Sequence, residues 1–259
     1  MKFEHFNKSE LEKYCIALDL DIRKKKKAEL IEAVYEYERN EIDLAIKDGR
    51  DNALLFTKIS SLADEYANNL KQKIKGRKKE MEADDNSHYL IYCVLGISET
   101  DGKQIDEYQN TGRFLYKYAG SFLEEAASLC LAFSNSSGSK TTIKNTEGAR
   151  PKTFEIDFLN GNNAIELKWR DATTDGDHIT KEHSRVIAIT KQGYTPVRIM
   201  FYYPQREQAI KIQKTLETLY AGVSGQYYAG ENAWKYLEKI SGYSLKSILL
   251  KIAEGRTFE

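Results

Sequence analysis

Cysteine and proline are both scarce in this chain, with three of each in 259 residues. Cys15, Cys93 and Cys130 are far apart in apolar patterns, without the paired spacing of a zinc site or a disulfide framework. Each cysteine is therefore expected to be a buried, reduced thiol. Long apolar runs are also missing, since the longest, residues 89–97, is far shorter than a membrane helix. No signal segment opens the chain, so we expect a cytoplasmic protein without a membrane partner.

The chain also has no excess of either charge, because 39 basic residues balance 39 acidic ones. This balance excludes a nonspecific polycation, but it does not exclude DNA, since local basic patches can bind phosphate groups. The length and a hydrophobic fraction of 41% are typical of one large globular domain, or of a catalytic domain with a small appendage.

Charged residues lie in two predicted strands, around a polar turn at residues 160–163, where apolar residues would be expected. Side chains alternate across a strand, so Glu166 and Lys168 share one face, and the turn folds Asp157 back toward them. Carboxylate oxygens suit a hard cation such as Mg²⁺, and a neighbouring lysine can hold or polarise an attacking water. This pattern predicts a hydrolytic phosphodiester site.

The alternative for any such Glu-x-Lys triplet is a cross-strand salt bridge on an exposed sheet face. One other acidic-x-Lys triplet exists in the chain, at residues 101–103, and it is expected in a polar turn without strand context. Glu155 shares the strand face of Asp157, which makes it either a phosphate-facing residue or a plain exposed carboxylate.

Asp157 followed by Glu166-Leu167-Lys168 resembles the signature of the PD-(D/E)xK nuclease superfamily, although Ile156 replaces the usual proline. The resemblance implies that Asp157 and Glu166 hold one or two Mg²⁺ ions, with the backbone carbonyl of Leu167 as a further ligand. It also implies that Lys168 positions the water or stabilises the transition state.

Members of that superfamily often contribute one more carboxylate from the helix before the strand pair. The sequence offers Glu124 and Glu125 there, and Gly120 one turn earlier favours Glu124. Whether Glu124, Glu125 or neither completes the site stays open at this point.

The order of predicted elements agrees with the superfamily, whose common core runs α-β-β-β-α-β. Helical spacing, strand patterns and turn residues place these elements at 112–133 (helix), 141–146, 153–159 and 164–169 (strands), 177–190 (helix) and 195–203 (strand). We therefore expect an α/β (α+β) fold with a central mixed sheet flanked by helices, plus a small N-terminal helical domain. The expected division is a helical hairpin at residues 1–40, a helical arm at 41–85 and a catalytic domain at 86–259.

The N-terminal region predicts a helical hairpin. Ser9 with Glu12 has the spacing of a capping box, and a second helix is expected from Lys26 to about Tyr37. This region resembles a SAP-type DNA-binding module over about residues 8–38. The run of basic residues in the loop and at the start of the second helix would lie where backbone amides and ammonium groups can bind a phosphate. The alternative is that this run is a solvated basic turn. The candidate DNA contacts here are Lys24, Lys25, Lys26 and Lys27.

Residues 169–185 leave the second active-site strand directly and are rich in groups that bind base edges or phosphates. Arg170, Lys181, His183 and Arg185 are the candidate DNA contacts, and a capping loop is the alternative. Over about residues 150–200 the chain resembles the ApaLI-type restriction endonucleases.

Together these features predict a type II restriction endonuclease that depends on Mg²⁺ and cuts double-stranded DNA at a specific sequence. The family resemblance implies that it leaves 5′-phosphate ends. The resemblance implies a homodimer, whose symmetry would match a palindromic site. Two alternatives stay open: a structure-specific repair or recombination nuclease with the same core, and a noncatalytic DNA-binding protein.

Overall fold

A computed structural model describes residues 6–18, 20–40, 45–135, 137–148, 150–170 and 176–256. It divides into two compact units. The sheet unit comprises Met1–Ser61 and Glu124–Glu259, and the arm unit comprises Leu62–Leu123. The division predicted above at residues 40 and 85 stays a prediction.

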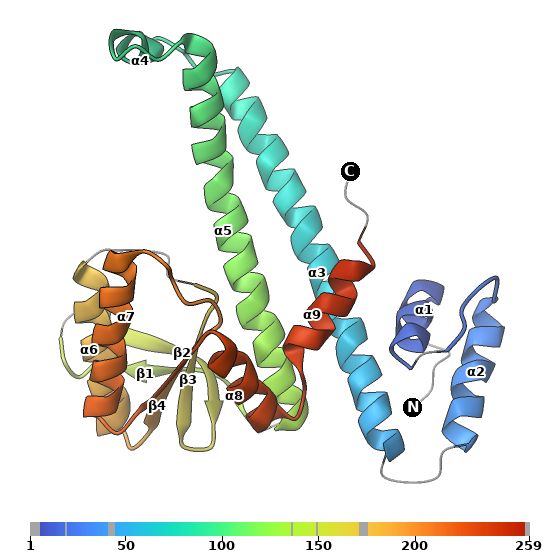
Figure 1. Cartoon of the computed structure of the whole chain (residues 1–259). Coiled ribbons are helices and arrows are strands. Elements are labelled where there is room, and N and C mark those ends of the chain that lie inside the picture. The colour runs from blue at the N-terminus through green and yellow to red at the C-terminus, as the bar shows by residue number, and fades with distance from the viewer. Residues whose placement is uncertain are drawn as a thin grey trace. The chain divides into compact units, whose positions relative to one another are not determined.

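A five-stranded mixed sheet forms the centre of the sheet unit, in the order β1-β2-β3-β4-β5 (Figure 1). The first three strands are antiparallel neighbours, whereas β3, β4 and β5 run parallel. The strands are β1 (Ser139–Lys144), β2 (Thr153–Asn160), β3 (Asn163–Lys168), β4 (Thr195–Met200) and β5 (Gln226–Ala229). The predicted mixed sheet is confirmed, with β5 as a short strand that the sequence did not indicate.

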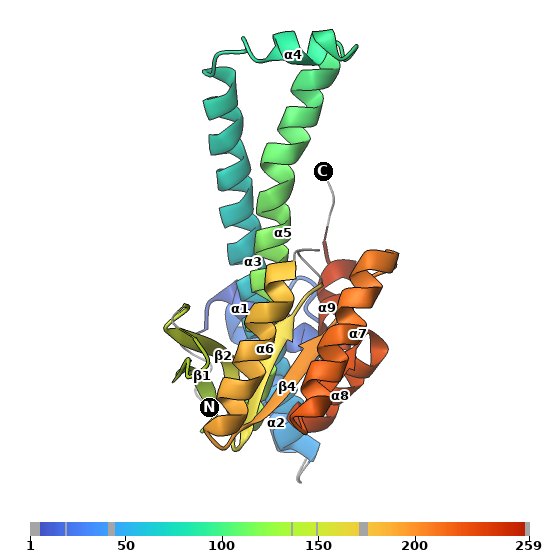
Figure 2. The ribbon, with the colours of Figure 1, turned by 90° about the vertical axis from the view of Figure 1, so that its left-hand side faces the viewer.

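Helices cover both faces of this sheet. Helices α6 (Gly176–Lys191) and α7 (Glu207–Gly222) lie side by side on one face, as Figure 2 shows. Helix α8 (Glu231–Ser241) and the last turns of α5 (Glu99–Ser134) lie on the other face, and α9 (Leu245–Glu254) follows. Helices α6 and α7 are the crossover connections that parallel strands require. Strands β3 and β4 are mostly buried, and the edge strand β5 is half-buried.

Strand β2 contains a bulge at the position that matters most for the site. Its register against β1 passes from Ser139↔Leu159 to Thr141↔Ile156, so two steps along β1 match three along β2. The additional residue lies between Ile156 and Leu159, in the segment that carries Asp157. Bulges bend a strand and turn a side chain out of the regular alternation. The bulge therefore sets where Asp157 points.

The N-terminal region of the sheet unit is helical, as predicted, with α1 (Lys8–Ala17), α2 (Lys27–Asn40) and the start of α3 (Ala45–Glu82). Its small core consists of Leu11, Tyr14, Cys15, Leu30, Val34 and Ala53.

The predicted cap of the first helix is wrong. Asn7 caps α1, because its side chain accepts the backbone N–H of Glu10 while the Glu10 carboxylate accepts that of Asn7. Asn7 and Ser9 each have an acidic residue three positions later, so both fit the capping-box pattern. A cap at Asn7 makes the helix longer than a cap at Ser9 would. Ser9 lies inside the first turn.

The arm unit pairs the end of α3 with the beginning of α5, which starts at Glu99 rather than near residue 112 as predicted. Residues 101–103 are therefore helical, and the prediction of a polar turn there is wrong. Lys78 Nζ lies 2.6 Å from Glu107 Oε1, and Arg77 donates to the side chain of Asn110. Along the chain, α4 (Tyr89–Val94) lies between α3 and α5.

The three thiols do not share one environment. Cys15 and Cys130 are buried, as expected, and burial raises the pKa of Cys130 to about 12. Cys93 lies in α4 and is exposed, so the prediction of a buried thiol is wrong there. No helix among the described residues is both long and apolar enough to cross a membrane.

Candidate active site

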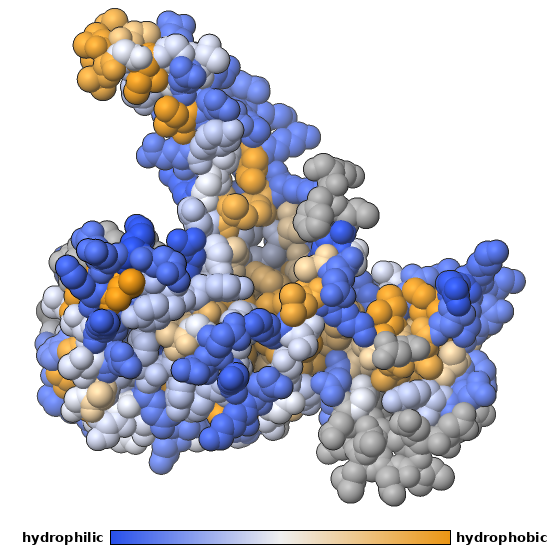
Figure 3. Space-filling model, in the orientation of Figure 1, coloured by the Kyte–Doolittle hydropathy of each residue, from blue (hydrophilic) through white to orange (hydrophobic). Residues whose placement is uncertain are grey.

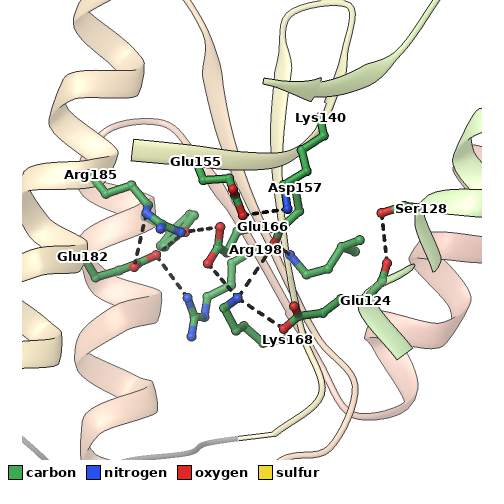
Figure 4. A network of polar contacts seen from close by, with 12 residues as sticks. Glu124, Ser128, Lys140, Glu155, Asp157, Glu166, Lys168, Glu182, Arg185 and Arg198 are labelled. Carbon is green, nitrogen blue, oxygen red and sulfur yellow. Dashed lines mark hydrogen bonds and ion pairs between the residues drawn. The ribbon is translucent and has the colours of Figure 1, made fainter. Parts of the chain in front are cut away.

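The structure brings the three residues of the predicted motif together at the junction of β2 and β3 (Figure 4). Lys168 Nζ lies 2.9 Å from Glu166 Oε1 and 3.8 Å from Asp157 Oδ2. Glu166 and Lys168 are on the same face of β3 because they are two residues apart in one strand. Asp157 reaches them from the bulged segment of β2.

Asp157 is held by the backbone of the opposite strand. Its Oδ2 accepts a hydrogen bond from the Leu167 N–H, at 2.8 Å. Burial, and next the negative charge of Glu166, raise the pKa of Asp157 to about 7, against the opposing effect of Lys168. Asp157 therefore titrates near neutral pH, because burial and a neighbouring carboxylate outweigh its contacts with Lys168 and the Leu167 N–H.

Glu166 is the most deeply buried member of the site. Lys168 binds its Oε1, and the Arg185 guanidinium from α6 binds its Oε2. Burial alone would raise the pKa of Glu166, but Lys168, Arg185 and Arg198 together lower it to about 2. Glu166 is therefore a fixed negative charge.

Lys168 is surrounded by carboxylates. Glu124 Oε1 is the third oxygen near its Nζ, at 3.3 Å. Burial would lower the pKa of Lys168, but Glu166, Asp157 and Glu124 raise it above its ordinary value. The ammonium group is therefore protonated at neutral pH and can donate hydrogen bonds but cannot serve as a base.

The structure distinguishes the other acidic candidates. Glu124 points from the end of α5 into the site, whereas Glu125 is exposed. Glu155 is exposed as well, and its Oε1 lies 2.8 Å from Lys140 Nζ (Figure 4). Of the alternatives left open above, the placement favours Glu124.

A second, fully buried polar cluster lies behind Glu166 and was not predicted from the sequence. Glu182 Oε1 accepts hydrogen bonds from the Tyr220 hydroxyl at 2.6 Å and from Arg198 Nη1 at 3.1 Å. Arg198 lies opposite Glu166 in the parallel ladder. Its Nε has no hydrogen-bond partner among the described residues. The cluster ties α6, α7 and β4 to the active-site strand.

Two sequence signals pointed to this cluster. Glu182 and Arg185 have the spacing of the buried Val186 and Ile189 on the inner face of α6. Arg198 interrupts an otherwise apolar strand. A charge inside a buried stripe indicates a partner in the interior.

The predicted DNA contacts are placed differently from one another. Arg170, Lys181 and His183 are exposed, and the Arg170 guanidinium lies over the Trp169 ring. Arg185 is half-buried in the ion pairs described above, and residues 171–175 lie outside the described residues. In the N-terminal hairpin, Lys24, Lys26 and Lys27 are exposed and Lys25 is half-buried.

The donor set fits a hard divalent cation. Oxygens of Asp157, Glu166 and Glu124 already surround one positive charge, the Lys168 ammonium. Within the described part of the chain, no three Asp, Glu, His or Cys side chains are arranged to hold a metal by themselves. Additional ligands would have to come from the Leu167 carbonyl, water or substrate phosphate, and Mg²⁺ commonly keeps several waters in such sites.

Comparison with known proteins identifies the family. Neither the curated proteins nor the solved structures contain a match to this chain. Residues 23–254 match the sequence profile of the ApaLI-like restriction endonucleases, which covers the whole site and most of the chain. The chain belongs to the ApaLI-like restriction endonuclease family.

Proposed function

We propose that this restriction endonuclease is a type II enzyme of the PD-(D/E)xK type, which requires Mg²⁺, cuts both DNA strands at a specific sequence and leaves 5′-phosphate ends. The observation that carries the proposal is the convergence of Asp157, Glu166 and Lys168 in one partly buried site. A structural salt bridge needs one carboxylate for one lysine, whereas this site holds three around one ammonium group. Such crowding of like charges marks functional sites.

The proposed mechanism assigns each group one role. Asp157 and Glu166 would hold Mg²⁺ with the Leu167 carbonyl, and Glu124 is close enough to assist. When bound, the metal supplies Lewis acidity that activates water and stabilises charge on the phosphate. Lys168 holds the attacking water and donates hydrogen bonds to the phosphate as negative charge grows there. The water oxygen bonds to phosphorus and releases a proton to solvent, while the bond to the 3′ oxygen breaks and that oxygen takes a proton from solvent. The products are a 5′-phosphate and a 3′-hydroxyl.

Exposed basic groups near the site support DNA binding. Arg170 and Lys181 carry charges that can contact phosphates, and His183 adds a group able to reach a base edge. The run of Lys24, Lys25, Lys26 and Lys27 at the start of α2 offers a second phosphate-binding surface on a SAP-like hairpin. A cytoplasmic homodimer, with one site for each strand of a palindrome, completes the proposal.

Variants in the site test the proposal against a matched control. Asp157→Ala, Glu166→Ala and Lys168→Ala should each reduce plasmid cleavage by about a thousandfold, while DNA binding measured in EDTA is largely kept. The control is Glu155→Gln, which removes a carboxylate of the same strand that is exposed and paired with Lys140. It should cut at the parent rate. Normal cleavage by all three site variants would contradict the proposed chemistry.

The digestion pattern tests specificity. Linear phage DNA incubated with Mg²⁺ should give sharp bands that EDTA abolishes. A smear, or nicking confined to junctions and ends, would favour a structure-directed nuclease. Intact DNA under all conditions would favour a binding protein without catalysis.

A further inference from the structure

Both oxygens of Glu166 are occupied by cations that belong to the protein. Lys168 Nζ binds Oε1 at 2.9 Å, and Arg185 Nη1 binds Oε2. The Glu166 side chain is buried, so little of the carboxylate faces open solvent. A divalent metal that uses this carboxylate is repelled by both cations and therefore competes with them for Glu166.

The two cations differ in how firmly the site holds them. Lys168 is within 4 Å of three carboxylates, those of Glu166, Glu124 and Asp157. Arg185 has two, Glu166 and Glu182, and its Nε lies 3.9 Å from Glu182 Oε2. Displacing Lys168 would loosen three interactions at once. Displacing Arg185 from Glu166 leaves its contact with Glu182 in place.

Glu182 offers a second carboxylate that the Arg185 guanidinium can bind. The Tyr220 hydroxyl and Arg198 Nη1 both bind its Oε1, at 2.6 and 3.1 Å, and so fix the carboxylate. Its Oε2 faces Arg185 (Figure 4). Because these partners come from α7 and β4, the second position does not depend on Glu166.

We propose that Arg185 is a built-in competitor of the divalent metal, holding Glu166 in the metal-free protein and moving toward Glu182 and the DNA backbone when metal and DNA bind. This inference rests on the proposed function, because it presumes that Glu166 is a metal ligand. In the free protein the guanidinium keeps metal affinity low. A DNA phosphate offers the released guanidinium another partner, so DNA and metal promote each other's binding reciprocally.

Metal binding without DNA tests the inference directly. The full-length protein, stripped with EDTA and dialysed, would be titrated with Mn²⁺, and free Mn²⁺ followed by electron paramagnetic resonance. Arg185→Gln should bind Mn²⁺ about tenfold more tightly than the parent, because it removes a charge-assisted contact that competes with the metal for Glu166. Lys191→Gln is the control, because it removes a cation from the same helix that pairs with Glu147 outside the site. It should bind as the parent does.

Unchanged or weaker Mn²⁺ binding by Arg185→Gln would overturn the inference, because Arg185 would then only support the structure. Should circular dichroism show that Arg185→Gln does not fold, Arg185→Lys takes its place. A single ammonium cannot bridge Glu166 and Glu182, so this variant should gain about threefold in Mn²⁺ affinity. No gain would be equally damaging.

Plasmid cleavage by the parent is assayed separately. A parent that never cuts DNA, with the expected change in Mn²⁺ affinity, would end the proposed function but leave the competition intact.

Discussion

Most proteins bury apolar side chains and expose charged ones, and the two units of this protein depart from that rule in different ways. The sheet unit buries charge, since Glu166, Glu182 and Arg198 are each at most 5% exposed. The arm unit instead exposes apolar side chains around α4, where Leu90, Val94 and Leu95 are each about 70% exposed. These side chains gather at the end of the arm that carries α4 (Figure 3).

The two departures have different consequences for stability. Buried charges lose their hydration, so each must keep its partners or the native state loses several kcal/mol. Exposed apolar side chains are in water in both the native and the unfolded chain, so folding gains little from them. Substitutions should therefore be severe in the buried cluster and mild at α4.

The largest effect on stability is expected at Glu182. Glu182→Ala leaves Arg198 buried without a counter-charge and removes the acceptor of the Tyr220 hydroxyl. The free energy of unfolding should fall by about 3–5 kcal/mol, measured by urea denaturation. Glu231→Ala breaks the exposed pair with Lys246 and should cost less than about 1 kcal/mol. Equal losses in both variants would remove the contrast between buried and exposed pairs.

The next effect concerns pH. Burial and Glu166 raise the pKa of Asp157 to about 7, so the native state keeps this proton after the unfolded chain has lost it. The stability that Asp157 contributes is therefore full below about pH 4 and is lost as the pH rises through about 7. Between about pH 5 and about pH 8 the metal-free parent should lose roughly 3 kcal/mol more than Asp157→Asn, which does not titrate. Urea denaturation in EDTA at both pH values measures the difference, and identical losses would contradict the raised pKa.

A smaller effect is expected at Tyr220. Tyr220→Phe removes one of the two hydrogen bonds to Glu182 Oε1 but leaves Arg198 in place. A hydrogen bond to a charged group contributes about 1.5–3 kcal/mol, so the loss should stay below that of Glu182→Ala. Urea denaturation of the two single variants and the double variant would show whether the two changes are coupled, as they are if the cluster acts as a unit. Additive losses would argue against a single network.

The sequence predicted the parts of this comparison that depend on local pattern. The turn at residues 160–163 brings Asp157 back toward Glu166 and Lys168, and Gly161 adopts the positive φ of 56° that such a turn requires. Charged residues inside an apolar strand pair were therefore enough to find the motif. Most strands and helices of the core could be placed for the same reason.

The remainder depended on tertiary structure that no local pattern contains. The bulge that turns Asp157 toward the Leu167 N–H follows from the pairing of β2 with β1, a strand whose register could not be deduced. Arg185 was predicted to contact DNA because it follows the active-site strand. Its partners, Glu166 and Glu182, appear only when α6 packs against the sheet.

The smallest effect is expected at α4, where one substitution can be compared in both units. Leu90→Ala removes a side chain that is 68% exposed, and the free energy of unfolding should change by no more than about 0.5 kcal/mol. Leu30→Ala makes the same change in the N-terminal core, where Leu30 is fully buried, and should cost about 2–5 kcal/mol. Urea denaturation followed by circular dichroism measures both. A loss at Leu90 as large as that at Leu30 would mean that the apolar side chains of α4 are buried in solution, because a side chain already in water has no burial to lose.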